Sequence, residues 1–315
     1  MTNADRQVGR VVLLTNPAAG HGNAPHAAEL ATARFQERGV DVVQIVGRDA
    51  THALQLTRDA LDDDVDALVV AGGDGVISLA WQVLAGTTIP LGIVPAGTGN
   101  DHAREYGVPT GAPEAAVDVV IDGVVETIDL GHFTGDDGTE RWFGTVMATG
   151  FDSIVSDRVN HMRWPHGRMR YNIAILAEFG RLRPLPFRLE FDDGTTMERA
   201  VTLIAFGNTR SYGGGMHITP GADHHDGLLD VTVLAATSRR KLIRFFPRVF
   251  SGTHVDLDEV STYRTASVRV ECDGINAYAD GEYLGPLPGV VSAIPDAGHI
   301  IRPRTPAPAG ATRGQ

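Results

Sequence analysis

The segment ALVVAGGDG, residues 67–75, decides the fold class of this chain. Its apolar run has the length of a buried strand and leads directly into glycines and an aspartate. Two further apolar runs behave in the same way: Val11–Leu14 precedes Asn16-Pro17-Ala18-Ala19-Gly20, and Ile93–Val94 precedes Gly97-Thr98-Gly99-Asn100-Asp101. A helical pattern follows each loop, so the three loops share a strand–loop–helix setting.

These loops predict a phosphate-binding edge. In an open parallel sheet, loops that follow strands gather at the carboxyl edge, where ligands bind. Glycines let the backbone approach a phosphate closely, and the helix behind presents free N–H groups. A single Gly-rich turn is also a common tight connection, and Asp74 and Asp101 could simply cap helices. If either carboxylate lies near a phosphate, a divalent cation, or water and Arg, must stand between them.

The whole first third alternates strand and helix signals, which predicts a doubly wound α/β domain. Its further expected strands are Val40–Val46 and Thr127–Leu130, and Ile89–Val94 extends the run before the third loop. The expected helices are His26–Arg38, a helix capped by Thr51 and running to Leu61, Ile77–Leu84 and Pro113–Asp122.

After Gly131 the pattern changes to short β-like runs, which predicts a second, β-sandwich-like domain. The runs are Trp142–Thr149, Phe187–Phe191, Ala200–Phe206, Leu228–Leu234 and Ser267–Glu271, with helical stretches at Met169–Arg181 and Ser238–Phe250. The expected organisation is α/β plus β: an α/β domain over 1–131, completed by a strand at about 298–303, and a β-rich domain over 132–297. The Pro- and Ala-rich residues 304–315 are expected to be a disordered tail.

Composition excludes several classes of protein. Of the 315 residues, 43% are hydrophobic and 21% are charged, as in globular proteins. No apolar run approaches the roughly 18 residues of a membrane span, and Met1–Arg10 lacks the core of a signal peptide, so we expect a cytoplasmic protein. The net charge of −12 argues against nucleic-acid binding. The one lysine, Lys241, lies outside every Gly-rich loop, which excludes a P-loop lysine.

The three loops, in this order and spacing, resemble the bacterial diacylglycerol kinase family, which also includes sphingosine and ceramide kinases. Pro220-Gly221-Ala222 followed by Asp226-Gly227-Leu228-Leu229-Asp230 is similar to a second family motif, and Asp280-Gly281-Glu282 to a third. The resemblance spans roughly residues 10–303.

The resemblance implies an ATP- and Mg²⁺-dependent lipid kinase. It implies an ATP site lined by Asn16–Gly20 and by Gly72, Gly73, Asp74, Gly75, Val76, Ile77 and Ser78, with Thr98 nearby. It further implies that Asp280 is the general base, and that Asp223, Asp226 and the carbonyl of Leu228 hold a structural Mg²⁺. Asp74, Asp101, Asp129 and Glu282 would form an acidic network. A homodimer is a further implication of the resemblance. We also expect a peripheral contact with the inner face of the membrane, on the basic segments described below.

The spacing of the proposed metal ligands agrees with this interpretation. Asp223, Asp226 and Leu228 stand at i, i+3 and i+5 in a polar loop, and oxygen ligands on one short loop suit a hard cation. A solvated acidic turn is the alternative. His224 and His225 are expected to face solvent, because Mg²⁺ prefers oxygen to imidazole.

Two positions depart from the family pattern. The second loop usually ends in Thr, and Val76 lacks that hydroxyl. The first loop commonly continues into Lys or another polar residue, and here it continues into His21. His21 could contact phosphate when it is protonated, or it could be an ordinary surface residue.

Two basic segments could contact a lipid surface. Residues 158–188 contain seven arginines and one acid, with interleaved aromatic residues. They suit an anionic membrane, ATP phosphates or the acidic first domain. In Ser238–Phe250, apolar residues recur at helical spacing with arginines between them. That pattern fits either packing on its own domain or membrane docking.

Three functions compete. A lipid kinase with diacylglycerol as the leading substrate is favoured by the Gly97–Asp101 loop and the Asp280–Glu282 motif. A small-molecule kinase such as an NAD kinase shares the Gly-Gly-Asp-Gly loop. A binding module that has lost activity is suggested only by Val76. Asp280 also has a structural interpretation, because Asp-Gly is favoured in hairpin turns for its geometry.

Overall fold

The computed structural model describes residues 7–15, 23–62, 64–150 and 184–304. The chain divides into two compact units, residues 1–127 with 299–315 and residues 128–298. It passes from the first unit to the second within β5 (Val124–Gly135) and returns within β15 (Gly289–Arg302). The loop Asn16–Gly20, His21, the expected helix Met169–Arg181, most of the basic segment 158–188 and residues 305–315 of the expected tail lie outside the described residues.

The first unit is built on a parallel sheet of β1 (Arg10–Thr15), β2 (Asp41–Val46), β3 (Ala67–Gly72) and β4 (Leu91–Pro95). The strand order is β2-β1-β3-β4, and the end of β15 adds in parallel to β4, with Ile300 opposite Leu91. Every residue of β3 and β4 is buried, as expected of strands covered on both faces. The order reverses between β1 and β3, and the loops after these two strands therefore diverge at the switch point where ligands bind.

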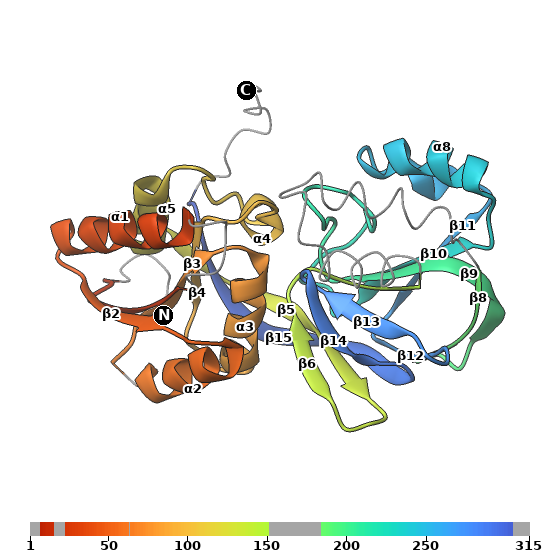
Figure 1. Cartoon of the computed structure of the whole chain (residues 1–315), viewed down its shortest axis with the longest axis horizontal. Coiled ribbons are helices and arrows are strands. Elements are labelled where there is room, and N and C mark those ends of the chain that lie inside the picture. The colour runs from red at the N-terminus through yellow and green to blue at the C-terminus, as the bar shows by residue number, and fades with distance from the viewer. Residues whose placement is uncertain (1–6, 16–22, 63, 151–183, 305–315) are drawn as a thin grey trace. The chain divides into compact units, whose positions relative to one another are not determined.

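Helices cover both faces of this sheet, which confirms the doubly wound class. Figure 1 shows α1 (Asn23–Glu37) and α5 (Pro113–Asp122) on one side of the strands, with α2 (Ala50–Ala60) and α3 (Asp74–Leu84) on the other. The short α4 (Asp101–Glu105) follows the third loop. The expectation that Thr51 caps α2 was wrong, because the Asp49 side chain accepts a hydrogen bond from His52 N at 2.8 Å.

The second unit is mainly antiparallel and β-sandwich-like, as expected. In order, its remaining strands are β6 (Glu140–Phe143), β7 (Val146–Gly150), β8 (Leu185–Phe191), β9 (Thr196–Gly207), β10 (Leu229–Ala235), β11 (Val260–Thr265), β12 (Ser267–Glu271), β13 (Asn276–Ala279) and β14 (Glu282–Pro286). The long β9 pairs with β8 along its first half and with β7 along its second half, and β10 lies on its other edge. Inward side chains of this unit, including Phe133, Phe143, Phe187 and Phe206, share one core.

Two expectations for this unit needed correction. The single expected strand Trp142–Thr149 is two strands, because Gly144 and Thr145 turn out of the ladder and bond the Asp280 carboxylate. Strands β11 and β14 were not anticipated, since each is short and carries exposed residues that interrupt an apolar pattern. The stretch Ser238–Phe250 contains α8 (Arg239–Val249), which packs on a smaller apolar cluster, and the 3₁₀ turn Thr253–Asp256 follows it. Among the described helices, none combines the length and apolar character needed to cross a bilayer.

Candidate active site

The second Gly-rich loop lies at the end of β3, where α3 begins. Gly73 is the N-cap of α3 and offers no side-chain hydrogen bond, so Asp74 already stands in the first helical turn. The N-terminal N–H groups of such a helix attract anions. The side chains of Val76, Ile77 and Ser78 point into the protein and are buried.

The second and third loops touch through their backbones. A Cβ built on Gly97 would lie 2.5 Å from the Cα of Gly73, and one built on Gly73 would lie 3.0 Å from the Cα of Gly97. Real Cβ atoms do not approach a backbone to 2.5 Å, so this packing requires glycine at position 97, and a Cβ at position 73 would force the two loops slightly apart. The structure therefore brings together two of the three predicted phosphate loops.

Asn100 closes the third loop upon itself. Its backbone is left-handed, with φ 53°, and its side chain accepts from Gly97 N at 3.0 Å while donating to Gly97 O at 2.9 Å. Thr98, at the tip between these bonds, is exposed. Asn tolerates this conformation better than most residues, which accounts for its place in the loop.

Asp74 and Asp101 flank the same glycine. A Cβ on Gly99 would lie 2.8 Å from Oδ2 of Asp74 and 3.4 Å from Oδ2 of Asp101. Arg104, one helical turn beyond Asp101, approaches its carboxylate to 3.6 Å and donates to the carbonyl of Gly99. The first unit thus gathers two predicted acids and one cation around the third loop.

A buried histidine orients Asp74. His102 Nδ1 lies 3.1 Å from Oδ1 of Asp74, and the indole N–H of Trp81 donates to Nε2 of the same ring at 3.3 Å. Because the indole is only a donor, Nε2 must be the acceptor and the proton sits on Nδ1, facing Asp74. Burial alone would raise the pKa of Asp74, but the hydrogen bonds that its carboxylate accepts from His102 lower it overall. Sequence reasoning missed these two hydrogen bonds of His102, because only the fold brings residues 81 and 102 together.

Val76 lines a small cavity rather than a polar surface. Its neighbours there include Leu14, Thr15, Gly47 and Asp49, at the ends of β1 and β2 and the start of α2. The branched side chain of Val76 also lies against Gly72, where an added Cβ would approach it to 3.0 Å. The atypical Val76 therefore has a packing explanation.

In the second unit, Asp280 occupies the hairpin between β13 and β14. Asp280 and Gly281 have φ of 53° and 83°, so both are left-handed, as in the tight turns that favour Asp-Gly. The Asp280 carboxylate is nonetheless buried. It accepts from Gly144 N at 2.9 Å, Thr145 N at 3.0 Å and Thr145 Oγ1 at 2.5 Å. The left-handed backbone of Asp280 therefore suits the turn, and the hydrogen bonds from Gly144 and Thr145 hold its carboxylate in one orientation.

Glu282 lies two residues beyond Asp280 and differs from it. The residue is exposed, yet desolvation of its carboxyl and then the charge of Asp280 raise its pKa. Asp280 and Glu282 are thus two nearby carboxyl groups with different environments, an arrangement found at functional sites.

Asn208 connects Asp280 to a second buried acid, Asp129. The fully buried Asn208 amide donates to the carbonyl of Asp129 at 2.9 Å and to that of Gly144 at 3.0 Å. The carboxylate of Asp129 accepts from Gly227 N at 2.7 Å and from Asp296 N at 3.0 Å. Sequence reasoning missed Asn208; its only signal was a polar residue directly after the buried run of β9.

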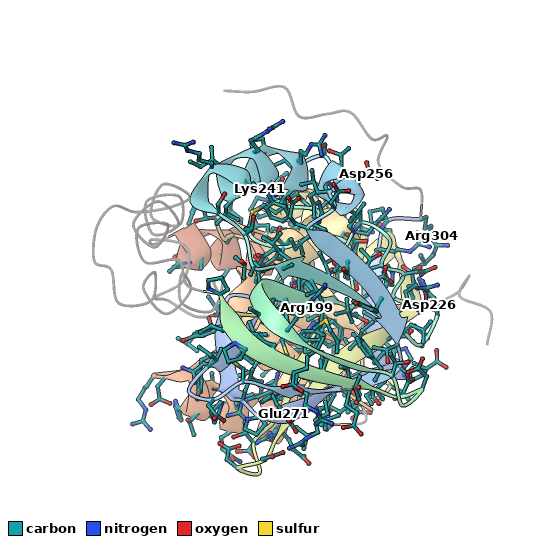
Figure 2. All side chains as sticks on the ribbon, turned by 90° about the vertical axis from the view of Figure 1, so that its right-hand side faces the viewer. Arg199, Asp226, Lys241, Asp256, Glu271 and Arg304 are labelled. Carbon is teal, nitrogen blue, oxygen red and sulfur yellow. The ribbon has the colours of Figure 1, made fainter. Side chains whose placement is uncertain are left out.

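The predicted metal loop is held by Asp129 and neutralised by an arginine. Asp226 accepts from Leu228 N at 2.9 Å and from Arg264, which also approaches Asp230 at 3.3 Å. Asp226 is labelled at the surface of the second unit in Figure 2. Burial, with smaller contributions from the charges of Asp226 and Asp223, raises the pKa of Asp230 despite Arg264. Crowded carboxylates of this kind fit a hard divalent cation, which relieves their repulsion.

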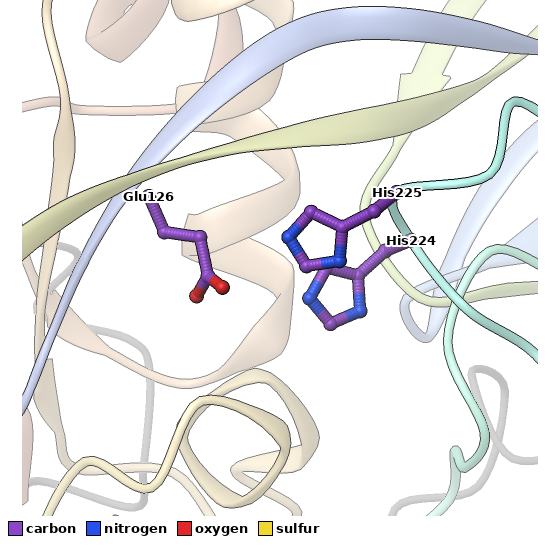
Figure 3. A group of neighbouring side chains, drawn as sticks. All are labelled: Glu126, His224 and His225. Carbon is purple, nitrogen blue, oxygen red and sulfur yellow. The ribbon is translucent and has the colours of Figure 1, made fainter. Parts of the chain in front are cut away.

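His225 is exposed, as expected, and its ring contacts the acidic loop. Its backbone N and its Nδ1 each lie 3.2 Å from Oδ1 of Asp223, and the hydrogen bonds and charge of His225 lower the pKa of the Asp223 carboxyl. The half-buried His224 stacks beside it, with ring centroids 4.3 Å apart (Figure 3). Glu126, also drawn in Figure 3, belongs to the first unit and forms an ion pair with Arg302 of that unit.

The four predicted acids are divided between the units. Asp74 and Asp101 lie in the first, and Asp129 and Glu282 in the second. Each unit builds its own part of the site from hydrogen bonds within that unit, and a network that joins all four stays a prediction.

Comparisons with known proteins find relatives for both parts of the chain. Residues 10–133 match the diacylglycerol kinase catalytic domain, and residues 145–302 match the YegS C-terminal NAD kinase beta sandwich-like domain. A diacylglycerol kinase from Mycobacterium tuberculosis is 61% identical over 298 residues, covering 95% of this chain and 96% of that protein. A probable lipid kinase YegS-like from Stenotrophomonas maltophilia is 31% identical, covering 74% of this chain and 76% of its own length.

A solved structure shares the fold. The crystal structure of a putative diacylglycerol kinase from Bacillus anthracis superposes with a TM-score of 0.77 at 22% identity, covering 98% of this chain and 99% of that one. Two family models that together span both units, and a relative of this identity over almost the full length, leave one assignment: the chain belongs to the diacylglycerol kinase family of lipid kinases.

Proposed function

We propose that this protein transfers the γ-phosphoryl group of ATP to the hydroxyl of diacylglycerol, giving phosphatidic acid, in a reaction that requires Mg²⁺. The observation that carries the proposal is the 61% identity, over 95% of the chain, to a protein named diacylglycerol kinase. A related lipid alcohol, such as a sphingoid base, is the alternative acceptor.

The nucleotide half of the reaction is assigned to the first unit. The ATP phosphates would be held by backbone N–H groups at the start of α3, within Gly72–Ser78. Thr98 and the loop Asn16–Gly20 would line the same site. The close approach of Gly73 to Gly97 supports this role, because a surface without side chains admits a phosphate. Since no lysine stands in these loops, Arg104, which contacts the third loop, is a cation that could balance phosphate charge.

The proton transfer is assigned to Asp280. Its carboxylate would take the proton from the lipid hydroxyl as the hydroxyl oxygen bonds to the γ-phosphorus, while the bond from that phosphorus to the bridging oxygen breaks and ADP leaves. The three hydrogen bonds from Gly144 and Thr145 support this assignment, because they fix the carboxylate before substrate arrives. Glu282 beside it is the second carboxylate to test.

The metal is assigned to the loop of Asp223, Asp226 and the Leu228 carbonyl. Mg²⁺ bound there would be structural and would balance the charge of the acidic loop. Asp129, which bonds Gly227, would transmit the position of this loop to the rest of the second unit. Asp74, Asp101 and Asp129 would complete a water-bridged acidic network.

The test is a product assay with purified protein. Labelled ATP and Mg²⁺ are incubated with dioleoylglycerol, ceramide, sphingosine or NAD, the lipids being presented in mixed micelles. We expect labelled phosphatidic acid as the main product. Labelled NADP would instead support an NAD kinase-like activity, and no transfer to any acceptor would support a non-catalytic binding module.

A pair of variants tests the base. Asp280→Asn should lower turnover by about 10²–10⁴ with nearly unchanged ATP affinity. It also turns an amide N–H toward a backbone N–H, so some loss of stability is expected. Thr145→Val is the matched control, because it removes one hydrogen bond to Asp280 and leaves the carboxylate. An equal loss of turnover in both variants would show that Asp280 acts only through its position.

A further inference from the structure

Helix α8 has an outer face that is both basic and apolar. Its eleven residues include five basic residues and no acid, in a chain whose net charge is −12. Leu242, Phe245 and Val249 are buried in the second unit and anchor the helix. The outer residues are therefore presented by a helix that already has its core contacts.

Two of the large apolar side chains that stand exposed on the described surface belong to this helix and its cap. Ile243 is 60% exposed and Phe250 is 49% exposed, and the exposed Pro247 lies between them on the same side of the helix. Residues 243, 247 and 250 are spaced i, i+4 and i+7, so they form one stripe. Phe250 also packs edge-on against the half-buried Phe246, which extends the stripe towards the core.

The cations form a second stripe beside the first. Arg240, Arg244 and Arg248 recur every four residues and are exposed, and among the described residues none of the three lies within ion-pair distance of an acid, although the charge of Arg244 acts on Glu259. Lys241, labelled in Figure 2, is bound to Glu259, which holds one end of the helix to the start of β11. Three arginines are thus left to interact with a partner.

We propose that the outer face of α8 is the surface by which this protein docks on an anionic lipid bilayer. The side chains of Ile243 and Phe250 would enter the boundary between headgroups and acyl chains, while Arg240, Arg244 and Arg248 contact lipid phosphates. Long arginine side chains can lie along an apolar surface with their charges at its polar edge, which suits the two adjacent stripes. The charge of α8 points to an anionic bilayer as the partner. A protein with net charge −12 is repelled from an anionic surface except where its basic residues are concentrated, as they are on α8.

The proposal rests on the lipid kinase function proposed above, because a substrate with two acyl chains confines the reaction to a membrane. The residues of α8 that would contact the membrane are not among those to which nucleotide binding, metal binding or proton transfer is assigned. Docking and chemistry are consequently separable by experiment.

Vesicle sedimentation tests the charge stripe. The full-length protein is mixed with vesicles of phosphatidylglycerol and phosphatidylcholine, or of phosphatidylcholine alone. Replacing Arg240, Arg244 and Arg248 with Gln should lower partitioning onto the anionic vesicles by about tenfold to a hundredfold. The matched control replaces Arg48, Arg58 and Arg141 with Gln, which changes the net charge equally and should leave partitioning unchanged. Equal effects of the two triple variants would overturn the proposal.

A second pair tests the apolar stripe. Ile243→Ser with Phe250→Ser should reduce the binding that persists at high salt, whereas Val46→Ser, at another exposed apolar position, should not. Retained binding in the double variant would overturn the insertion of α8.

Activity separates the two proposals. All α8 variants should phosphorylate a short-chain diacylglycerol dispersed in detergent at the wild-type rate and lose activity only on vesicles. Vesicle binding by a wild-type protein that phosphorylates no diacylglycerol would refute the proposed function and leave docking intact. Loss of activity on the short-chain substrate would show that α8 serves the fold or the active site instead.

Discussion

His102 holds Asp74 through its Nδ1, 3.1 Å from Oδ1 of the carboxylate, while Trp81 donates to the other nitrogen of the ring. His102→Leu keeps most of the buried volume but leaves the Trp81 indole N–H without its acceptor and removes the side-chain hydrogen bond to Asp74, which keeps the backbone N–H of residue 102. We expect the free energy of unfolding to fall by about 2–4 kcal/mol, measured by urea denaturation.

A double variant tests whether the hydrogen bond between Trp81 and His102 accounts for this loss of stability. Adding Trp81→Phe to His102→Leu removes the orphaned N–H and should recover part of the stability lost by the single variant. Strict additivity of the two substitutions would contradict a direct coupling between residues 81 and 102.

The contact between Gly73 and Gly97 predicts a loss of nucleotide binding on substitution. Gly97→Ala places a Cβ within 2.5 Å of the Gly73 backbone and 2.9 Å of Asn100 Oδ1, which must push the two loops apart. Calorimetric titration should show at least a tenfold weaker affinity for ATP, an order-of-magnitude expectation for a displaced phosphate loop. Gly9→Ala, where the nearest atom is 3.7 Å away, should change nothing.

The acidic loop predicts a stabilising effect of Mg²⁺. A bound ion adds to stability by mass action, so Mg²⁺ should raise the melting temperature of the wild-type protein. Asp226→Ala should remove most of that increase, whereas Asp258→Ala, an exposed acid elsewhere in the second unit, should retain it. The same Mg²⁺-dependent increase in both variants would place the ion elsewhere.

Asn208 offers a stability test of the link between Asp129 and Gly144. Asn208→Leu leaves two buried carbonyls unpaired and should lower the free energy of unfolding by about 2–4 kcal/mol. The neighbouring Thr209 is the control: its buried Oγ1 has no hydrogen-bond partner among the described residues. Thr209→Val should therefore be neutral or slightly stabilising, and a similar loss in both variants would attribute the effect to this turn as a whole.

Buried histidines make stability depend on pH. His254 is fully buried against Phe245, and burial lowers its pKa. Below about pH 6.5 the His254 side chain binds a proton in the unfolded chain but not in the folded one. The free energy of unfolding should therefore decrease as the pH is lowered, by up to about 1.4 kcal/mol per pH unit, until the pKa of His254 in the folded protein is reached. Denaturation at several pH values should show a shallower slope in His254→Leu. A residual slope is expected from His132, whose pKa burial also lowers.

Local patterns were read correctly where one segment contains the whole signal. Pro113–Asp122 and Ser267–Glu271 were predicted with the bounds that the structure has, since apolar spacing, an initial Pro and flanking Gly or Thr lie within a few residues. The loops at Gly72–Gly75 and Gly97–Asp101 were found for the same reason. The strand expected over Trp142–Thr149 was wrong because its interruption at Gly144 depends on Asp280, 136 residues away.

The sequence by itself determined the two-part architecture, the family and the residue types of the site, because periodicity and Gly-containing motifs are local properties of the chain. Only the tertiary structure decided what those residues touch. It assigned His102 to Asp74, Asn208 to Asp129 and Gly144, and the Thr145 hydroxyl to Asp280. Buried polar groups must find partners inside the protein, and those partners are chosen by how strands and helices pack, which no local pattern records.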